Sequence, residues 1–152
     1  MPGYKKHLSV AFILYGAVLA FFALRQLAIS QAVEWLLFIL LGALFPDIDI
    51  KSKGQLLFYH IVLLLLLYFF LTGQWSALIG LSLLSCMPLV VNHRGIFHNF
   101  AFILLVVLAS TSLGCYVWPH RYIFLCYDAC FFLLGVFSHL ALDKGIWGVF
   151  KF

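Results

Sequence analysis

The sequence predicts an all-α, polytopic membrane protein in which six transmembrane helices form one bundle joined by short loops. Apolar residues make up 66% of the 152 residues and charged residues 9%, and the mean hydropathy is +1.14. A soluble domain has about 45–50% apolar and about 25% charged residues, so a soluble fold is excluded. The 17 Phe, 7 Tyr and 4 Trp exclude a disordered chain, because disordered chains are poor in aromatic residues. We therefore expect a single membrane-embedded domain over residues 1–152.

Six apolar runs follow one another, and each approaches the roughly 17–25 residues that cross the hydrocarbon core of a bilayer. The first follows Lys5, Lys6 and His7 without a small-residue cleavage site, so we interpret it as an anchor and not as a signal peptide. The second has a short apolar part that ends at Pro46, and it reaches spanning length only when it begins at Ala28. The predicted spans are 8–24, 28–45, 56–72, 76–91, 96–118 and 121–142.

Basic residues predict the orientation of these spans, because cytoplasmic loops carry an excess of Lys and Arg. If the N-terminus is cytoplasmic, only Arg25 and Arg121 lie on the outer side. The basic residues on the inner side are Lys5, Lys6, Lys51, Lys53, Arg94, Lys144 and Lys151. We therefore expect both termini in the cytoplasm.

The net charge of +4 is too small, and the basic residues are too scattered, to predict a nucleic-acid partner.

Histidines and acidic residues gather at the cytoplasmic end of this predicted arrangement. Among the histidines, only His120 falls on the outer side. Ionisable residues within or beside a membrane commonly mark functional sites, so the clustering predicts a site at one face of the bilayer. The residues at this end are His7, Asp47, Asp49, His60, His93, His98, His139 and Asp143.

The local spacings of these residues suit metal coordination. His139 and Asp143 are four residues apart and share one helix face. Asp47 and Asp49 would point the same way in an extended segment, which Pro46 would favour. Gly95 would allow a tight turn that brings the imidazoles of His93 and His98 together. Mixed nitrogen and oxygen donors suit Zn, Mn or Fe, bound as one or two ions. The candidate ligands are His7, Asp47, Asp49, His93, His98, His139 and Asp143.

These motifs resemble those of the LexA-regulated, inner-membrane-bound metal-dependent hydrolase family. The resemblance extends from His7 to Asp143 and implies a multi-span protein of the bacterial inner membrane, with the matching residues as metal ligands. One departure is that Phe97-His98-Asn99 stands where family members often have Thr-His-Ser, so the hydroxyl groups beside His98 are absent. The matching motifs are His7, Pro46-Asp47-Ile48-Asp49, His93-Arg94-Gly95-x-x-His98 and Ser138-His139-x-x-x-Asp143.

The leading functional hypothesis is a membrane-bound, metal-dependent hydrolase with a site that faces the cytoplasm. A metal would activate water, Asp49 or Asp143 would accept a proton or hold that water, and Arg94 would stabilise charge on the substrate. Arg94 could alternatively serve only as a topology anchor. Because the site would lie near the lipid headgroups, we expect membrane lipids as partners and a lipid or amphiphilic phosphoester as substrate, with ester or amide hydrolysis as alternatives.

Two non-enzymatic hypotheses stay open at this stage. The first is a transporter or channel for metal ions or protons, whose polar path should cross the bilayer. The middle and outer thirds of the spans offer only Asp128, His120 and Arg121 for such a path. The second is a scaffold with a structural metal, which four ligands would normally close completely.

Several other residues are expected to have structural roles. We interpret His60 as a packed residue or as support for a ligand, and Asp128 as a partner of Arg121 seven residues earlier. The four cysteines do not form a zinc-binding pattern, and packing is expected for them, with a Cys115–Cys126 disulfide as the alternative. Close helix contacts are expected at Gly42, Gly80 and Gly135.

Overall fold

The computed structural model describes residues 3–22, 28–48, 52–90 and 96–149, and these residues form helices without any strand. Short 3₁₀ turns extend some of the helices, namely η2 (Phe45–Asp47), η3 (Ile96–His98), η4 (Pro119–Arg121) and η5 (Ile146–Gly148). The α-helices are α1 (Tyr4–Phe22), α2 (Ile29–Leu44), α3 (Lys53–Leu71), α4 (Trp75–Val90), α5 (Phe100–Val117) and α6 (Tyr122–Lys144). The prediction of an all-α protein is confirmed.

Each predicted span corresponds to one helix, and four segments are long and apolar enough to cross a membrane. These segments are Ile29–Asp47, Lys53–Leu71, Phe100–Val117 and Pro119–Lys144. The first of them contains the run with the shortest apolar part, so that run is a full candidate span. Because α1 and α4 are not among the four, the six-span arrangement remains a prediction.

The fifth helix begins later than the sequence suggested, at Phe100 instead of residue 96. The side chain of Asn99 accepts hydrogen bonds from the backbone N–H groups of Ala101 and Phe102, at 3.0 and 3.3 Å. Asn99 is therefore the N-cap of α5. The residues before it form the separate turn η3, which leaves His98 outside the helix and close to the end of α2.

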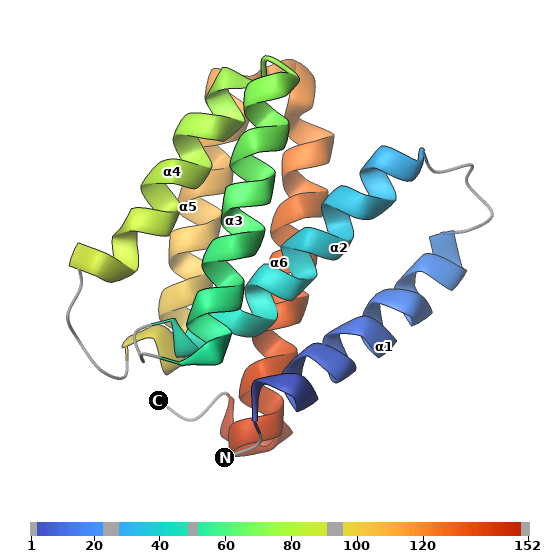
Figure 1. Cartoon of the computed structure of the whole chain (residues 1–152), viewed down its shortest axis with the longest axis vertical. Helices are drawn as coiled ribbons and strands as arrows, with labels where there is room; N and C mark the ends of the chain where they lie inside the picture. The colour runs from blue at the N-terminus through green and yellow to red at the C-terminus, as the bar shows by residue number, and fades with distance from the viewer. Residues whose placement is uncertain (1–2, 23–27, 49–51, 91–95, 150–152) are drawn as a thin grey trace.

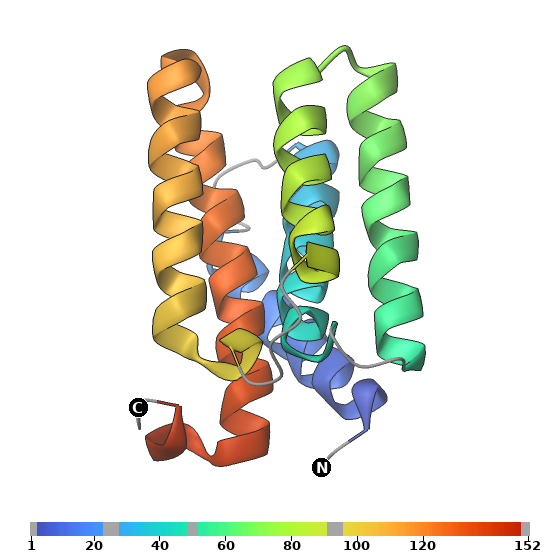
Figure 2. The same ribbon diagram turned by 90° about the vertical axis from the view of Figure 1, so that its left-hand side faces the viewer.

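The helices alternate in direction, so their ends gather at two sides of the molecule (Figure 1). We call one side the lower end: there α1, α3 and α5 begin and α2 and α6 end, as drawn in Figure 1. Figure 2 shows the α5–α6 pair on one side of the molecule and the α3–α4 pair on the other, with α2 partly hidden behind α4. Residues from the beginning, the middle and the end of the sequence therefore lie together at the lower end.

Two glycines allow α2 and α6, the most extensively packed helix pair, to approach closely. A Cβ atom at Gly42 would overlap the carbonyl oxygen of Phe132, and one at Gly135 would overlap the carbonyl oxygen of Ile39. The predicted close contacts at Gly42 and Gly135 are thus confirmed. The prediction for Gly80 is wrong for the part of the chain that the structure describes, because none of its atoms lies within 4 Å of a Cβ built there. The approach brings the C-terminal ends of α2 and α6 together at the lower end.

Aromatic side chains fill the space around this helix pair. Trp35 of α2 stacks on Phe131 of α6 with ring centroids 4.9 Å apart. Nearer the lower end, Phe45 contacts Phe132 and Phe97 edge-on, at 5.3 and 5.5 Å between centroids. Phe97 is fully buried. Phe45 therefore joins η3 to the α2–α6 pair through a rigid aromatic contact.

One structural expectation for the other end of the bundle is supported, and one alternative is excluded. Arg121 donates a hydrogen bond to the side chain of Gln74 at 2.6 Å, and its charge also acts favourably on the carboxylate of Asp128. Arg121 is thus a distant partner of Asp128, as expected, without a direct ion pair among the described residues. All four cysteines are free, so the alternative of a Cys115–Cys126 disulfide does not apply.

The glycine contact gives a direct test of the α2–α6 packing. Gly135→Ala should lower the free energy of unfolding by about 1–3 kcal/mol, because the added methyl group overpacks the contact. Gly80→Ala is the matched control, since its Cβ enters open space and alanine favours a helix by about 0.5–1 kcal/mol. Thermal unfolding in detergent, followed by circular dichroism, measures both. Equal stability of the two variants would contradict the close approach.

Candidate metal centre

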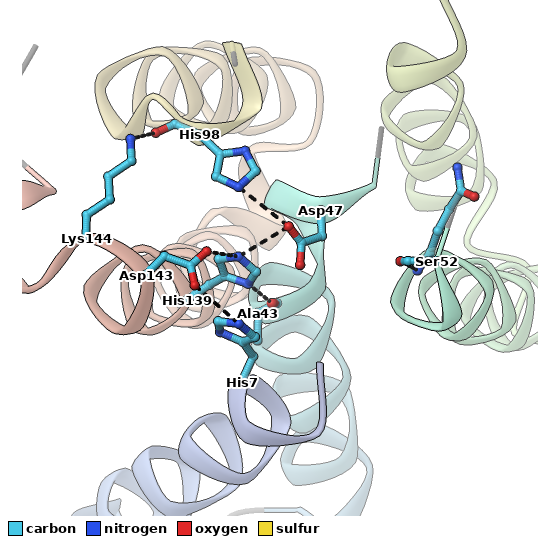
Figure 3. A network of polar contacts seen from close by, with 9 residues as sticks. His7, Ala43, Asp47, Ser52, His98, His139, Asp143 and Lys144 are labelled. Carbon is cyan, nitrogen blue, oxygen red and sulfur yellow. Dashed lines mark hydrogen bonds and ion pairs between the residues drawn. The ribbon is translucent and has the colours of Figure 1, made fainter. Parts of the chain in front are cut away.

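Four side chains from three separate segments converge at the lower end. Asp47 comes from η2, His98 from η3, and His139 and Asp143 from the last turns of α6. Each offers one donor atom, and the four donor atoms all lie within 4.8 Å of one another. Figure 3 shows the four side chains pointing toward one another, with His7 of α1 beside them. We call Asp47, His98, His139 and Asp143 the four-donor group.

His139 is oriented by the backbone of α2. Its Nδ1 lies 2.7 Å from the carbonyl oxygen of Ala43 in a buried hydrogen bond, and a carbonyl can only accept. Nδ1 therefore carries the proton, and in the neutral ring Nε2 presents its lone pair. Nε2 lies 3.2 Å from Asp143 Oδ2 and 3.7 Å from Asp47 Oδ1. A carbonyl that orients a histidine in this way is a common support for a metal ligand.

The separations between donors match those around a small cation. His98 Nε2 lies 3.5 Å from Asp47 Oδ1, so with the two distances from His139 these nitrogen–oxygen separations run from 3.2 to 3.7 Å. Ligand bonds of about 2.0–2.2 Å in a tetrahedral zinc site place neighbouring donors about 3.3–3.6 Å apart. The donors are therefore spaced as ligands of one ion.

The charges within the group also favour a cation. Asp143 has a side chain that is 6% exposed, and its Oδ1 has no hydrogen-bond partner among the described residues. No Lys or Arg in the described ranges lies within ion-pair distance of Asp47 or Asp143. Burying carboxylates without a compensating charge is costly. A divalent cation between the donors would balance both carboxylates.

Asp47 reaches the group by a different route from the one expected. The sequence predicted an extended segment after Pro46, but Phe45–Asp47 forms a 3₁₀ turn with Pro46 in its first positions. Proline suits the beginning of a helical turn, where no N–H is required. The side chain of Gln55 donates to the carbonyl of Ile48 at 2.8 Å, which ties the turn to the beginning of α3.

Two contacts hold His98 in place, one made by the preceding residue and one made by its own carbonyl group. The preceding Phe97 is buried against Phe45. The carbonyl oxygen of His98 accepts a hydrogen bond from Lys144 Nζ at 2.8 Å, which joins η3 to the end of α6 (Figure 3). Sequence reasoning treated Lys144 only as a topology signal and overlooked this contact. Its position directly after Asp143 was the available indication.

His7 lies beside the four-donor group and supports it. Its ring stacks on His139 with centroids 3.8 Å apart and an interplanar angle of 13°, and its Nε2 is 3.6 Å from Asp143 Oδ1. Helix α1 is held in place by Tyr15, whose hydroxyl donates to the carbonyl of Ala32 in α2. The predicted ligand His7 is thus near the site, where it contacts both His139 and Asp143.

The remaining candidate residues separate into two classes. Asp49, His93 and Arg94 lie outside the described residues, so their predicted roles stay predictions. His60 is exposed on α3, and its Nδ1 lies 2.7 Å from the carbonyl of Leu56 in the same helix. The expectation that His60 is packed is therefore wrong, and its support of a ligand stays a prediction.

Access to the group is one-sided. The side chain of His139 is 1% exposed, whereas those of His98 and Asp47 are 17% and 29% exposed. The helices thus enclose His139 and Asp143, while η2 and η3 leave part of the group open. Among the described residues, Asp47 and His98 are therefore the donors that a ligand from outside would meet first.

The fold and this site define a helical membrane protein with a group of His and Asp side chains that could hold a metal. The chain belongs to the family described as YdjM inner membrane protein, which matches residues 1–145. This confirms an inner-membrane family, whereas LexA regulation and hydrolysis remain predictions. No curated protein and no solved structure gives a significant match.

Metal content provides the first test of the four-donor group. His139→Ala should reduce bound zinc to background, because the variant loses the most enclosed donor. His60→Ala should retain the wild-type content, since His60 lies exposed on α3. Elemental analysis of the purified, zinc-loaded and desalted proteins measures the ratio of metal to protein. Wild-type zinc content in a folded His139→Ala protein would contradict the assignment.

Lys144 should strengthen zinc binding through its hydrogen bond to the His98 carbonyl, and not through its charge alone. Lys144→Met removes the hydrogen bond to the His98 carbonyl and should weaken zinc binding about 10- to 100-fold, as expected for the loss of a group that orients a ligand. Lys53→Met removes an equally exposed lysine at the lower end and is the control. Competition with a chromophoric chelator gives both affinities, and equal affinities would refute the role of Lys144.

Proposed function

We propose that this protein is a membrane-bound, metal-dependent hydrolase whose site faces the cytoplasm and acts on a lipid or amphiphilic phosphoester. The observation that carries the proposal is the placement of His139 Nε2. The Ala43 carbonyl aims it at two carboxylates, with His98 completing a set of two nitrogens and two oxygens. Such mixed donors suit zinc best, with manganese or iron as alternatives.

When bound, the ion supplies Lewis-acid chemistry: it polarises a phosphoryl oxygen and makes water a better nucleophile at neutral pH. The residues that would hold it are Asp47, His98, His139 and Asp143. The exposure of Asp47 and His98 supports a site with an accessible side, as catalytic sites require. A purely structural site would be enclosed by its four ligands on every side.

Within the protein, Asp143 and His7 are suited to move a proton. Asp143 turns Oδ2 toward His139 and Oδ1 toward His7 Nε2. In the proposed reaction, Asp143 Oδ1 accepts a proton from the attacking water, and His7 Nε2 shares it across their 3.6 Å separation. His7 is then a positioning and proton-sharing residue, since none of its atoms belongs to the four-donor group.

The location of the group supports a substrate with a polar head and an apolar tail. Three of the four donors, Asp47, His139 and Asp143, lie in the last turns of two segments long enough to span the membrane, Ile29–Asp47 and Pro119–Lys144. The ends of such segments lie near the lipid headgroups. A phosphoester headgroup would therefore meet the donors at their own depth, with its acyl chains remaining in the bilayer.

The packing between the two ends of the bundle opposes a transport path. Asp128 is the buried acid nearer the other end of α6. Between it and His139 the helix presents Phe131, Phe132 and Val136, all buried, and Gly135 is in backbone contact with α2. Polar groups on the two sides are separated by a close-packed apolar layer, so we favour a reaction at one surface over conduction.

A lipid panel tests the proposed activity. Purified protein in mixed micelles with zinc or manganese should release the headgroup or phosphate from at least one phospholipid or lipid phosphate. A chelator should abolish turnover and added metal should restore it. Asp143→Asn should reduce turnover by about 10²-fold or more, since it removes a metal ligand and a proton acceptor together. Metal-loaded wild-type protein that hydrolyses none of these lipids, nor carboxyl ester or amide analogues, would refute the proposal.

His7→Gln separates proton sharing from metal retention. The variant should keep the zinc content of the wild type while its turnover falls and the acidic limb of its pH profile changes. Tyr15→Phe, which removes the hydroxyl that bonds α1 to α2, is the control for a displaced α1. Loss of metal from a folded His7→Gln protein would instead make His7 a ligand.

A further inference from the structure

We propose that η5, the turn that follows α6, is a membrane-interface anchor that inserts among the headgroups of anionic lipids and sets the depth of the lower end. This inference does not depend on the four-donor group binding a metal. It commits to one partner, a lipid surface, although a second protein chain is an alternative that the experiment below distinguishes.

The turn presents two large apolar side chains outward from a rigid base. Trp147 is 86% exposed and Ile146 is 63% exposed. Gly145, at a φ of 74°, reverses the chain after α6, a conformation that glycine adopts without strain. The N–H of Gly148 donates to the carbonyl of Gly145 at 2.9 Å, and Val149 is buried. The outward position of Trp147 is therefore built into the turn.

The rest of the bundle places η5 at a bilayer boundary. Helix α6 has 23 residues, which extend about 34 Å at 1.5 Å per residue and slightly exceed the hydrocarbon core of about 30 Å. Exposed aromatic residues at its other end, Trp75, Tyr116 and Tyr122, are typical of one membrane–water interface. Trp147 supplies the corresponding aromatic residue for the opposite interface.

The charges around η5 favour lipid headgroups as the partner. Four lysines at the lower end are exposed, whereas the described part of the other end carries one cation, Arg121, which is bonded to Gln74. Lysine stems lie along apolar surface while their ammonium groups reach the headgroups. A lysine near an anionic leaflet contributes about 1 kcal/mol of attraction. The exposed lysines are Lys5, Lys6, Lys53 and Lys144.

The anchor would determine where the donors lie relative to the lipids. Asp143 precedes Trp147 by four residues, and Lys144, between them, is bonded to the His98 segment. If Trp147 sits among the headgroups, the open side of the four-donor group lies at the level of the lipid phosphates. If η5 bound a protein partner instead, it would not set the depth of the four-donor group relative to the lipid phosphates.

Fluorescence of single-tryptophan proteins in liposomes tests the proposal. W35F/W75F/W118F retains only Trp147, and W75F/W118F/W147F retains only Trp35, which is 3% exposed. The liposomes contain phosphatidylethanolamine and phosphatidylglycerol, with phosphatidylcholine brominated either near the headgroup or near the chain end. Trp147 should be quenched severalfold more by the shallow bromines than by the deep ones, and Trp35 should be quenched weakly by both.

Two other outcomes would overturn the proposal. Quenching of Trp147 by aqueous iodide and not by brominated lipid would place η5 in water. Protection from both quenchers would place it against protein. Because triple variants can fail to fold, a second measurement uses the full chain labelled with 5-fluorotryptophan, with W147F assigning its ¹⁹F resonance. A gadolinium chelate on lipid headgroups should broaden the Trp147 resonance, and an unchanged resonance would equally refute the anchor.

Discussion

The hydrogen bond between His139 and the Ala43 carbonyl is the interaction on which the lower end of the protein depends. Ala43 lies in the last turn of α2, where carbonyl groups lack partners within the helix. One buried bond of 2.7 Å therefore satisfies a backbone acceptor and also selects the tautomer of His139. It can form only because Gly42 and Gly135 let the helices touch. The close packing of α2 and α6 and the orientation of His139 therefore depend on each other.

The sequence anticipated the parts of this protein that follow from local pattern. The apolar runs predicted the helices, and the shared face of His139 and Asp143 followed from helical spacing alone. The lower end itself was expected, because five histidines and three acids gathered at one predicted surface. Gly42 and Gly135 were also recognised as contact points. All of these depend on periodicity or on the scarcity of charge.

Features that depend on contacts between distant segments were not predictable in the same way. The stacking of His7 on His139 joins the first and last helices, and no local rule sets that distance. The 3₁₀ turn at Asp47 arises because Pro46 can begin a helical turn as well as interrupt one. Lys144 was assigned to topology, since only the folded chain brings its ammonium group to the His98 carbonyl.

The stacking of His7 on His139 also affects how the chain is completed. His7 lies in α1 and Asp143 in α6, so the lower end can be assembled only after α6 has followed α1 into the membrane. An ion bound there would favour the folded state over every partly assembled one. It would also join segments as far apart in the sequence as Asp47 and Asp143, and closing so long a loop is entropically costly. The site would then stabilise only the arrangement in which α2, η3 and α6 are all in place.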